Sequence, residues 1–145
     1  MKKIKQIEIM IALIFGLSYC CFLSSCNQKI LPEIINPDQE GLNTEVREFL
    51  LSGTPGVLVL GTGLCENCKI VKNIVIRMKE QRKDLKLSWL VYENYQDRKT
   101  FQAFNLTISP TTYLISTNHQ ILKRIIGTFT EQELLDNLKE EGLIH

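Results

Sequence analysis

The sequence predicts an α/β protein, a three-layer α/β/α sandwich with a mixed central sheet. Apolar patterning indicates the order helix, strand, helix, strand, helix, strand, strand, helix over about a hundred residues. Because the early strands alternate with helices, they are expected to pair in parallel, whereas the last two strands form an antiparallel hairpin. A chain of 145 residues, 44% hydrophobic and 23% charged, has room for this one domain and a short appendage.

A short helix and a buried strand are predicted at the start of the domain. Val46, Phe49 and Leu50 fall at helical spacing within residues 44–52, and a Gly-Thr-Pro-Gly stretch ends that helix. Residues 57–60 follow as a continuous apolar run bounded by glycines. Such a run is typical of a central strand that is buried on both faces.

A longer amphipathic helix is predicted to begin at or near Cys65. Its apolar residues recur every three to four positions, with charged residues between them: Ile70, Val71, Ile74, Val75 and Met78. Residues 85–92, Leu-Lys-Leu-Ser-Trp-Leu-Val-Tyr, predict a second interior strand. A short helix is expected over residues 97–104, ahead of a loop that ends at Ser109-Pro110.

The last part of the domain carries a hairpin signal and a helix-start signal. Residues 111–115 and 121–126 are rich in β-branched and aromatic residues and flank a Thr-Asn-His-Gln turn. Thr130 and Glu133 have the spacing of a capping box, in which each side chain satisfies a backbone N–H of the other. The final helix is therefore expected to start at Thr130.

The first 26 residues are organised as an export signal. Three lysines precede an apolar stretch, residues 9–23, and two serines then lead to Cys26. Leu23-Ser24-Ser25-Cys26 resembles the lipobox of bacterial lipoproteins, and this resemblance implies cleavage before Cys26 and attachment of a diacylglycerol to its thiol. An uncleaved signal anchor is the alternative, although about 15 apolar residues are short for a spanning helix, which needs roughly 20.

These features divide the chain into three parts. Residues 1–25 are expected to be a lipoprotein signal peptide, residues 26–43 a lipidated cysteine with a flexible tether, and residues 44–145 the folded domain. The tether is polar, contains two prolines and shows no sustained period. We therefore expect a protein of the cell envelope, lipid-anchored on the periplasmic or extracytoplasmic face of a membrane.

The charge balance argues against a nucleic-acid partner. The full chain has 17 basic and 16 acidic residues. Without the three lysines and one glutamate of residues 1–26, 14 basic and 15 acidic residues remain. Phosphate recognition calls for a basic face, and a near-neutral body does not indicate one. The same balance argues against an electrostatic membrane patch.

Cys65 and Cys68 are the cysteines that remain once the signal and the lipidation position are set aside. A Cys-x-x-Cys pair that opens a helix directly after a buried strand indicates a redox site. The spacing lets the two sulfurs close a small ring, and the helix N-terminus supplies partial positive charge that favours a thiolate. We expect Cys65, nearer the solvent, to attack a substrate disulfide and Cys68 to resolve the mixed disulfide.

Four features together resemble thioredoxin. They are the strand before these cysteines, the Cys-Glu-Asn-Cys motif, Ser109-Pro110-Thr111 about forty residues later and a glycine before the capped helix. The resemblance spans roughly residues 44–142 and implies the thioredoxin-like form of the sandwich. It also implies that Pro110 follows a cis peptide bond beside the cysteines, and that the backbone of Ser109 pairs with an incoming peptide as an added strand.

Three positions depart from the thioredoxin pattern. Leu64 stands where thioredoxin has tryptophan, Glu66-Asn67 replaces Gly-Pro between the cysteines, and Val59 occupies the position of a buried aspartate that helps to deprotonate the resolving thiol. Glu66 disfavours a thiolate at Cys65, whereas a nearby lysine favours it. The reactivity of the pair is therefore expected to be retuned.

The sequence thus predicts an envelope thiol-disulfide oxidoreductase that acts on exported, cysteine-containing proteins. Its redox-active dithiol serves without a bound cofactor or metal, and a membrane electron donor or acceptor completes the cycle. We expect a monomer that is held at the membrane through its lipid anchor. The direction stays open among reductant, oxidant and isomerase, with a reductase favoured over an oxidase.

The cysteine pair has two other interpretations, a metal site and a structural disulfide. A closed zinc site needs four ligands, and the mature chain offers only His119 and His145 besides the cysteines. A non-catalytic thioredoxin-like binding module with a structural Cys65–Cys68 disulfide is the other alternative, although so short a loop restrains the unfolded chain little. Glu93 and Tyr95 either border the active face or are solvated loop residues.

Overall fold

The computed structural model describes residues 33–145. These residues contain eight helices and strands in the predicted order: α2 (Thr44–Leu51), β1 (Gly56–Gly61), α3 (Glu66–Gln81), β2 (Lys86–Val91), α4 (Arg98–Ala103), β3 (Thr111–Ile115), β4 (Ile121–Ile126) and α5 (Glu131–Glu140). The predicted signal peptide and Cys26 lie outside the described residues. Within residues 33–145, no helix has the length and apolar character of a membrane span.

The four strands form one mixed sheet in the order β2-β1-β3-β4. Strands β1 and β2 are parallel, with Val59 opposite Trp89. Strand β3 is antiparallel to β1 and to β4, and Val59 lies opposite Thr112. The prediction of a parallel start and an antiparallel hairpin at the end is therefore confirmed, because the only parallel pair in the described residues is the one joined through α3.

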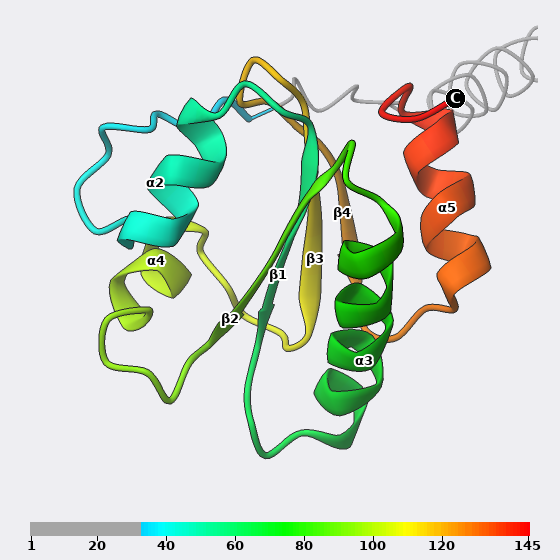
Figure 1. Cartoon of the computed structure of the whole chain (residues 1–145). Helices are drawn as coiled ribbons and strands as arrows, with labels where there is room; N and C mark the ends of the chain where they lie inside the picture. Colours follow the sequence, from blue (N-terminus) through cyan, green and yellow to red (C-terminus); the bar gives the residue numbers. More distant parts are fainter. Residues whose placement is uncertain (1–32) are drawn as a thin grey trace, which may run out of the picture. The chain divides into compact units, whose positions relative to one another are not determined.

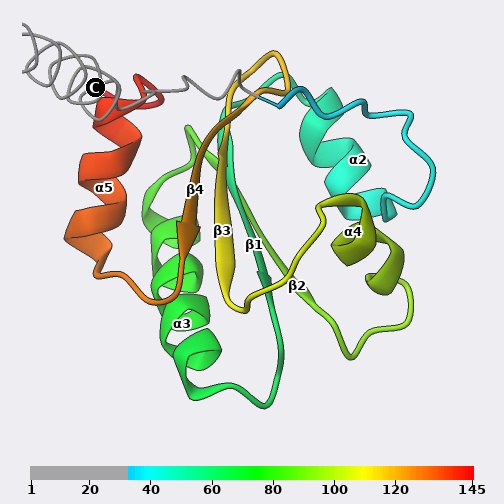
Figure 2. The ribbon, with the colours of Figure 1, turned by 180° about the vertical axis from the view of Figure 1, so that it is seen from behind.

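Helices cover both faces of the sheet (Figures 1 and 2). Helices α3 and α5 lie on one face, and α2 and α4 lie on the other. Alternate residues of β1 feed the two cores, Val57 and Val59 toward α3 and α5, Leu58 and Leu60 toward α2 and α4. All six residues of β1 are buried, which confirms the predicted strand that is covered on both faces.

The packed unit begins before residue 44, the boundary that composition predicts. The Ile121 N–H donates a hydrogen bond to the Glu33 carbonyl over 2.8 Å, and the Ile35 N–H donates to the His119 carbonyl over 3.0 Å. Ile35 and Leu42 are buried. Residues 33–43 are therefore not a free tether, and two apolar residues in a polar stretch produce no period by which the sequence could reveal this packing.

The last helix has the predicted start. Thr130 Oγ1 accepts a hydrogen bond from the Glu133 N–H over 3.2 Å, and the Glu133 carboxylate accepts one from the Thr130 N–H over 2.7 Å. These bonds lower the pKa of Glu133, the backbone N–H of Thr130 contributing most. Phe129 and Leu134, on either side of the cap, are buried in the same core as α3.

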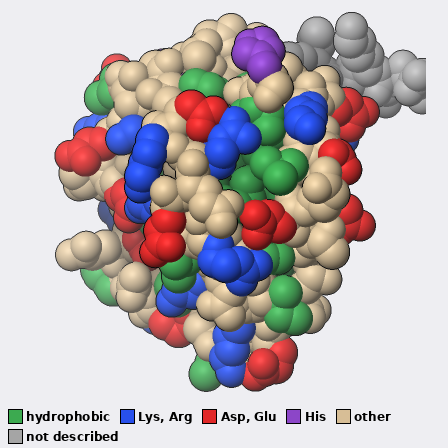
Figure 3. All heavy atoms as spheres, turned by 45° about the vertical axis from the view of Figure 1, so that its right-hand side comes forward, with side chains coloured by type: hydrophobic (Ala, Val, Ile, Leu, Met, Phe, Trp, Pro, Cys, Tyr) green, Lys and Arg blue, Asp and Glu red, His purple; other side chains and the backbone are tan. Residues whose placement is uncertain are grey.

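On the face formed by α3 and α5, acidic and basic side chains are interspersed (Figure 3). Arg77 pairs with Glu131 across the two helices, and Lys123 of β4 pairs with Glu140. This face therefore offers no single-sign surface of the kind that binds nucleic acid.

Truncation of Leu134 to alanine is expected to lower the free energy of unfolding by about 2–5 kcal/mol, because the side chain is fully buried between α5 and the sheet. Leu51→Ala removes the same atoms from a side chain that is 63% exposed, so its effect is expected within about 0.5 kcal/mol. Urea unfolding of both variants tests this packing, and equal losses would contradict it.

Candidate active site

The two cysteines lie where β1 passes into α3: Cys65 ends the loop that joins these elements, at the bottom of Figure 1, and Cys68 is in the first turn of α3. Strand β1 ends at Gly61, and Cys65 is the N-cap of α3 with extended backbone angles. Its sulfur accepts a hydrogen bond from the Cys68 N–H over 3.2 Å, so a cysteine takes the role that serine or threonine usually has at a cap. The prediction that the helix begins at Cys65 is confirmed.

Exposure separates the two thiols. Cys65 is half-buried, whereas Cys68 has an exposed fraction of 0%. Cys68 lies one turn into α3, on the side of the helix that faces the sheet. A disulfide of another protein can therefore reach the Cys65 sulfur and not the Cys68 sulfur.

Hydrogen bonds converge on the buried sulfur. The Thr62 N–H donates to Cys68 Sγ over 3.5 Å, and Ser109 Oγ lies 3.3 Å from the same atom. Burial raises the pKa of Cys68, but hydrogen bonds from Cys65, Ser109 and Thr62 outweigh burial and lower it. The hydrogen bond with the Cys68 side chain raises the pKa of Cys65, although the Cys68 N–H opposes this.

The pKa of Cys65 is raised and that of Cys68 is lowered, whereas the sequence predicted that the helix N-terminus would favour a thiolate at Cys65. More donors reach Cys68 than Cys65, and once Cys68 is a thiolate, the Cys65 thiol donates to it. Of the two thiols, the buried Cys68 therefore loses its proton more readily than the exposed Cys65.

The charged residues of the motif neutralise each other. Lys69 Nζ lies 2.6 Å from Glu66 Oε1, and both side chains are exposed. The hydrogen bond to Glu66 raises the pKa of Lys69. The pKa of Cys65 is shifted by Cys68, by burial and by the Asn67 backbone. Glu66 and Lys69 are not among these groups, because they form an ion pair with each other at the surface.

The Ser109–Pro110 peptide bond is cis, as the resemblance implies. Pro110 is buried, and β3 begins at the next residue. Thr111 Oγ1 donates to the Ile108 carbonyl over 2.6 Å, and the Gly127 N–H donates to the Pro110 carbonyl over 2.9 Å. These bonds hold the loop in place beside Cys68.

Several solved structures share this architecture. Chloroplastic thioredoxin z superposes with a TM-score of 0.60 at 11% identity, covering 70% of this chain and 91% of the other. Thioredoxin NaTrxh from Nicotiana alata gives 0.58 at 15% identity and covers 70% and 88%. Mitochondrial thioredoxin 3 from Saccharomyces cerevisiae gives 0.56 at 18% identity and covers 67% and 88%.

The chain has the thioredoxin-like fold. No protein-family model and no curated protein sequence matches this chain. At the identities above, the likeness is one of fold alone.

At residue 59 the site has a valine, which cannot ionise, where thioredoxin has a buried aspartate. Val59 is fully buried on the sheet face that packs against α3, in one row with Trp89 and Thr112. The hydrogen-bond partners of the Cys68 sulfur come instead from the loop after β1 and from the loop before β3. Nothing in the local sequence pattern of Thr62 indicates this contact.

Exposed apolar side chains lie on the segments that carry the site. Leu64, directly before Cys65, is 88% exposed, and Ile108 and Tyr92 are about half exposed. Beside them lies a cavity of about 410 Å³, lined by Thr62, Tyr92, Phe101, Gln102, Asn105 and Leu106. Exposed apolar residues beside a concave surface favour contact with a peptide chain.

The Glu93 carboxylate accepts a hydrogen bond from the Gly63 N–H over 2.9 Å. Glu93 therefore borders the active face and holds the loop before Cys65, whereas Tyr95 is 82% exposed. Among residues 33–145, no three His, Cys, Asp or Glu side chains gather in an arrangement for a metal ion.

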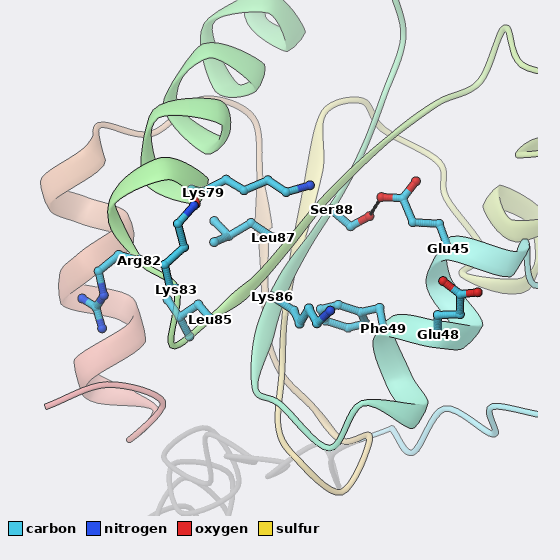
Figure 4. A pocket seen from close by; sticks show the side chains of 10 residues that line it. All are labelled: Glu45, Glu48, Phe49, Lys79, Arg82, Lys83, Leu85, Lys86, Leu87 and Ser88. Carbon is cyan, nitrogen blue, oxygen red and sulfur yellow. Dashed lines mark hydrogen bonds between the residues drawn. The ribbon is translucent and has the colours of Figure 1, made fainter.

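A second cavity, of about 330 Å³, lies far from the cysteines (Figure 4). It is bordered by the start of β2 and the last turn of α3, where Ser88 donates a hydrogen bond to Glu45. The 16 residues of α3 separate this end from Cys65 by roughly 24 Å. Its residues therefore take no part in the chemistry of the pair.

Alkylation of the reduced, folded protein is expected to modify Cys65 first. Because Cys68 is buried, its reaction with iodoacetamide is expected to be at least about tenfold slower, despite its lower pKa. Mass spectrometry of time points locates the label. In urea, both thiols are expected to react at similar rates, and preferential labelling of Cys68 in the folded protein would contradict the geometry.

Proposed function

We propose that this protein is a thiol-disulfide oxidoreductase that exchanges disulfides with exported proteins. The observation that carries the proposal is a half-buried Cys65 at a helix N-cap with a fully buried, hydrogen-bonded Cys68 one turn behind it. An accessible first thiol and a protected second thiol are what two-step disulfide exchange requires. The thioredoxin-like fold supports this class of activity in general terms.

The first step joins Cys65 to the substrate. Its thiol transfers its proton to the Cys68 thiolate, to which it is hydrogen-bonded, and its sulfur attacks one sulfur of the substrate disulfide. The Cys65–substrate disulfide forms, the substrate S–S bond breaks, and the first substrate thiolate leaves. That thiolate then takes up a proton.

The second step releases the substrate. Cys68 loses its proton, and its thiolate attacks the Cys65 sulfur, so that the Cys65–Cys68 disulfide forms and the second substrate thiolate leaves. Two electrons have passed from the dithiol to the substrate, which takes up two protons. A donor of two electrons, such as a membrane-bound dithiol, is needed to return the pair to its reduced form.

Reduction of the substrate is the direction that we propose, and the reduction potential decides it. Equilibration with glutathione buffers is expected to give a value near that of thioredoxin, about −270 mV. A value near −120 mV would identify an oxidant that installs disulfides instead.

Exported substrates call for a location in the cell envelope, and we propose anchorage through Cys26. The first described residues are held beside the β3–β4 turn through Glu33 and Ile35. This turn lies at the Gly56 end of β1, whereas Cys65 follows the other end. A lipid tether that joins the domain there leaves the exposed thiol directed away from the point of attachment.

The Cys65→Ser variant is expected to reduce insulin no faster than the buffer dithiol alone, because the attacking sulfur is lost. Cys68→Ser keeps that sulfur but is expected to accumulate a mixed disulfide, visible as an added mass on non-reducing gels. If wild type reduces insulin no faster than Cys65→Ser, the pair is a structural bridge and the domain is a binding module.

Replacement of Cys26 by alanine in the full-length protein is expected to remove the mass of the attached lipid, because the thiol that would carry the lipid is lost. Cys20→Ala, within the predicted signal peptide, serves as the matched control and is expected to keep that mass. Intact-mass spectrometry measures both variants, and an unchanged Cys26→Ala protein would exclude lipidation at this position.

A further inference from the structure

We propose that the hydroxyl group of Ser109 is the donor that stabilises the Cys68 thiolate during the second step of the exchange. This role belongs to the side chain and is separate from the pairing of the Ser109 backbone with a substrate peptide. It rests on the proposed two-step exchange and identifies the residue that controls release of the substrate.

The contacts around Cys68 change as the reaction proceeds. In the dithiol, three residues supply the partners of the sulfur: the Cys65 thiol, Thr62 through its N–H at 3.5 Å and through its side chain, and Ser109 Oγ at 3.3 Å. Once Cys65 is bound to a substrate, it has no S–H group to donate. Thr62, through its N–H and its side chain, and the Ser109 hydroxyl are then the donors that remain among the described residues.

A buried thiolate depends on such donors. Cys68 is fully buried, and burial alone raises its pKa. The one titratable side chain among its partners is Cys65, and Val59 places an apolar group on the sheet face that packs against α3. No described carboxylate or cation is among the groups that shift the pKa of Cys68, so hydrogen bonds must stabilise its charge.

Ser109 meets this need better than a backbone donor. A hydroxyl can accept the proton of the Cys68 thiol and also donate to the Cys68 thiolate, so it bonds to both states of the sulfur. The contact to Cys68 is the only hydrogen bond of Ser109 Oγ within residues 33–145. The flanking bonds from Thr111 and Gly127 hold its loop, so the hydroxyl can rotate while its oxygen stays beside the sulfur.

Thiol titration of the full chain in detergent tests the contact without turnover. In a Cys65→Ala background, the thiolate absorbance of Cys68 is followed with pH in variants carrying Ser109→Thr or Ser109→Val, whose side chains have nearly the same shape. A hydrogen bond to a charged sulfur predicts a pKa of Cys68 about one to two units higher with valine than with threonine. Equal pKa values in the two variants would overturn the proposal.

The lifetime of the mixed disulfide tests the step itself. With Cys65 present and glutathione disulfide as the substrate, Ser109→Val is expected to lengthen the lifetime of the Cys65–glutathione disulfide about three- to tenfold near pH 7. A higher pKa lowers the thiolate fraction and only partly compensates through stronger nucleophilicity. Ser109→Thr is expected to restore the wild-type lifetime, whereas an unrestored lifetime would assign the effect to shape.

Thr107→Val is the matched control, because it removes a hydroxyl from an exposed residue of the same loop. It is expected to leave both the pKa and the lifetime unchanged, and an equal effect would show that the loop rather than the Ser109 hydroxyl is responsible. If wild type forms no mixed disulfide at all, the proposed function fails, while the titration in the Cys65→Ala background still decides the role of Ser109.

Discussion

Strand β1 is covered by helices on both faces, and this double burial positions every other element of the domain. Its alternate side chains enter two separate cores, one shared with α3 and α5 and one shared with α2 and α4. Because β1 has a neighbour on each side, it also fixes β2 and β3. The chain can leave β1 only at the edge of the sheet, and α3 starts five residues later, so the N-terminus of α3 and its cysteines are held at that edge.

The chemistry of the site follows from a competition at one buried sulfur. Desolvation disfavours a thiolate at Cys68, whereas hydrogen bonds from Cys65, Ser109 and Thr62 favour it and outweigh burial. Two of those donors belong to loops that are 47 residues apart in the chain, at Thr62 and Ser109, and β1 brings them together because it pairs with β3. The pairing of two strands therefore controls the reactivity of a residue on a helix.

Local sequence patterns were enough to predict most of the fold. The apolar run of β1, the three-to-four spacing of α3 and the capping box at Thr130 each arise from neighbours in the sequence, so they could be recognised without the structure. The packing of residues 33–43 could not, because it depends on bonds from Glu33 and Ile35 to a turn more than eighty residues away. The same limit applied to Glu93, whose bond to Gly63 crosses from one loop to another.

The motif between the cysteines explains less of the site than its sequence suggests. Glu66 differs from the thioredoxin pattern and carries charge, yet it pairs with Lys69 at the surface. Val59 also differs from the thioredoxin pattern, but it replaces an ionisable residue with an apolar one at a buried position, where no water screens a charge. Because a charge is screened less in the interior than at the surface, we expect the retuning of this thioredoxin-like site to arise from Val59, behind the cysteines, rather than from the residues between them.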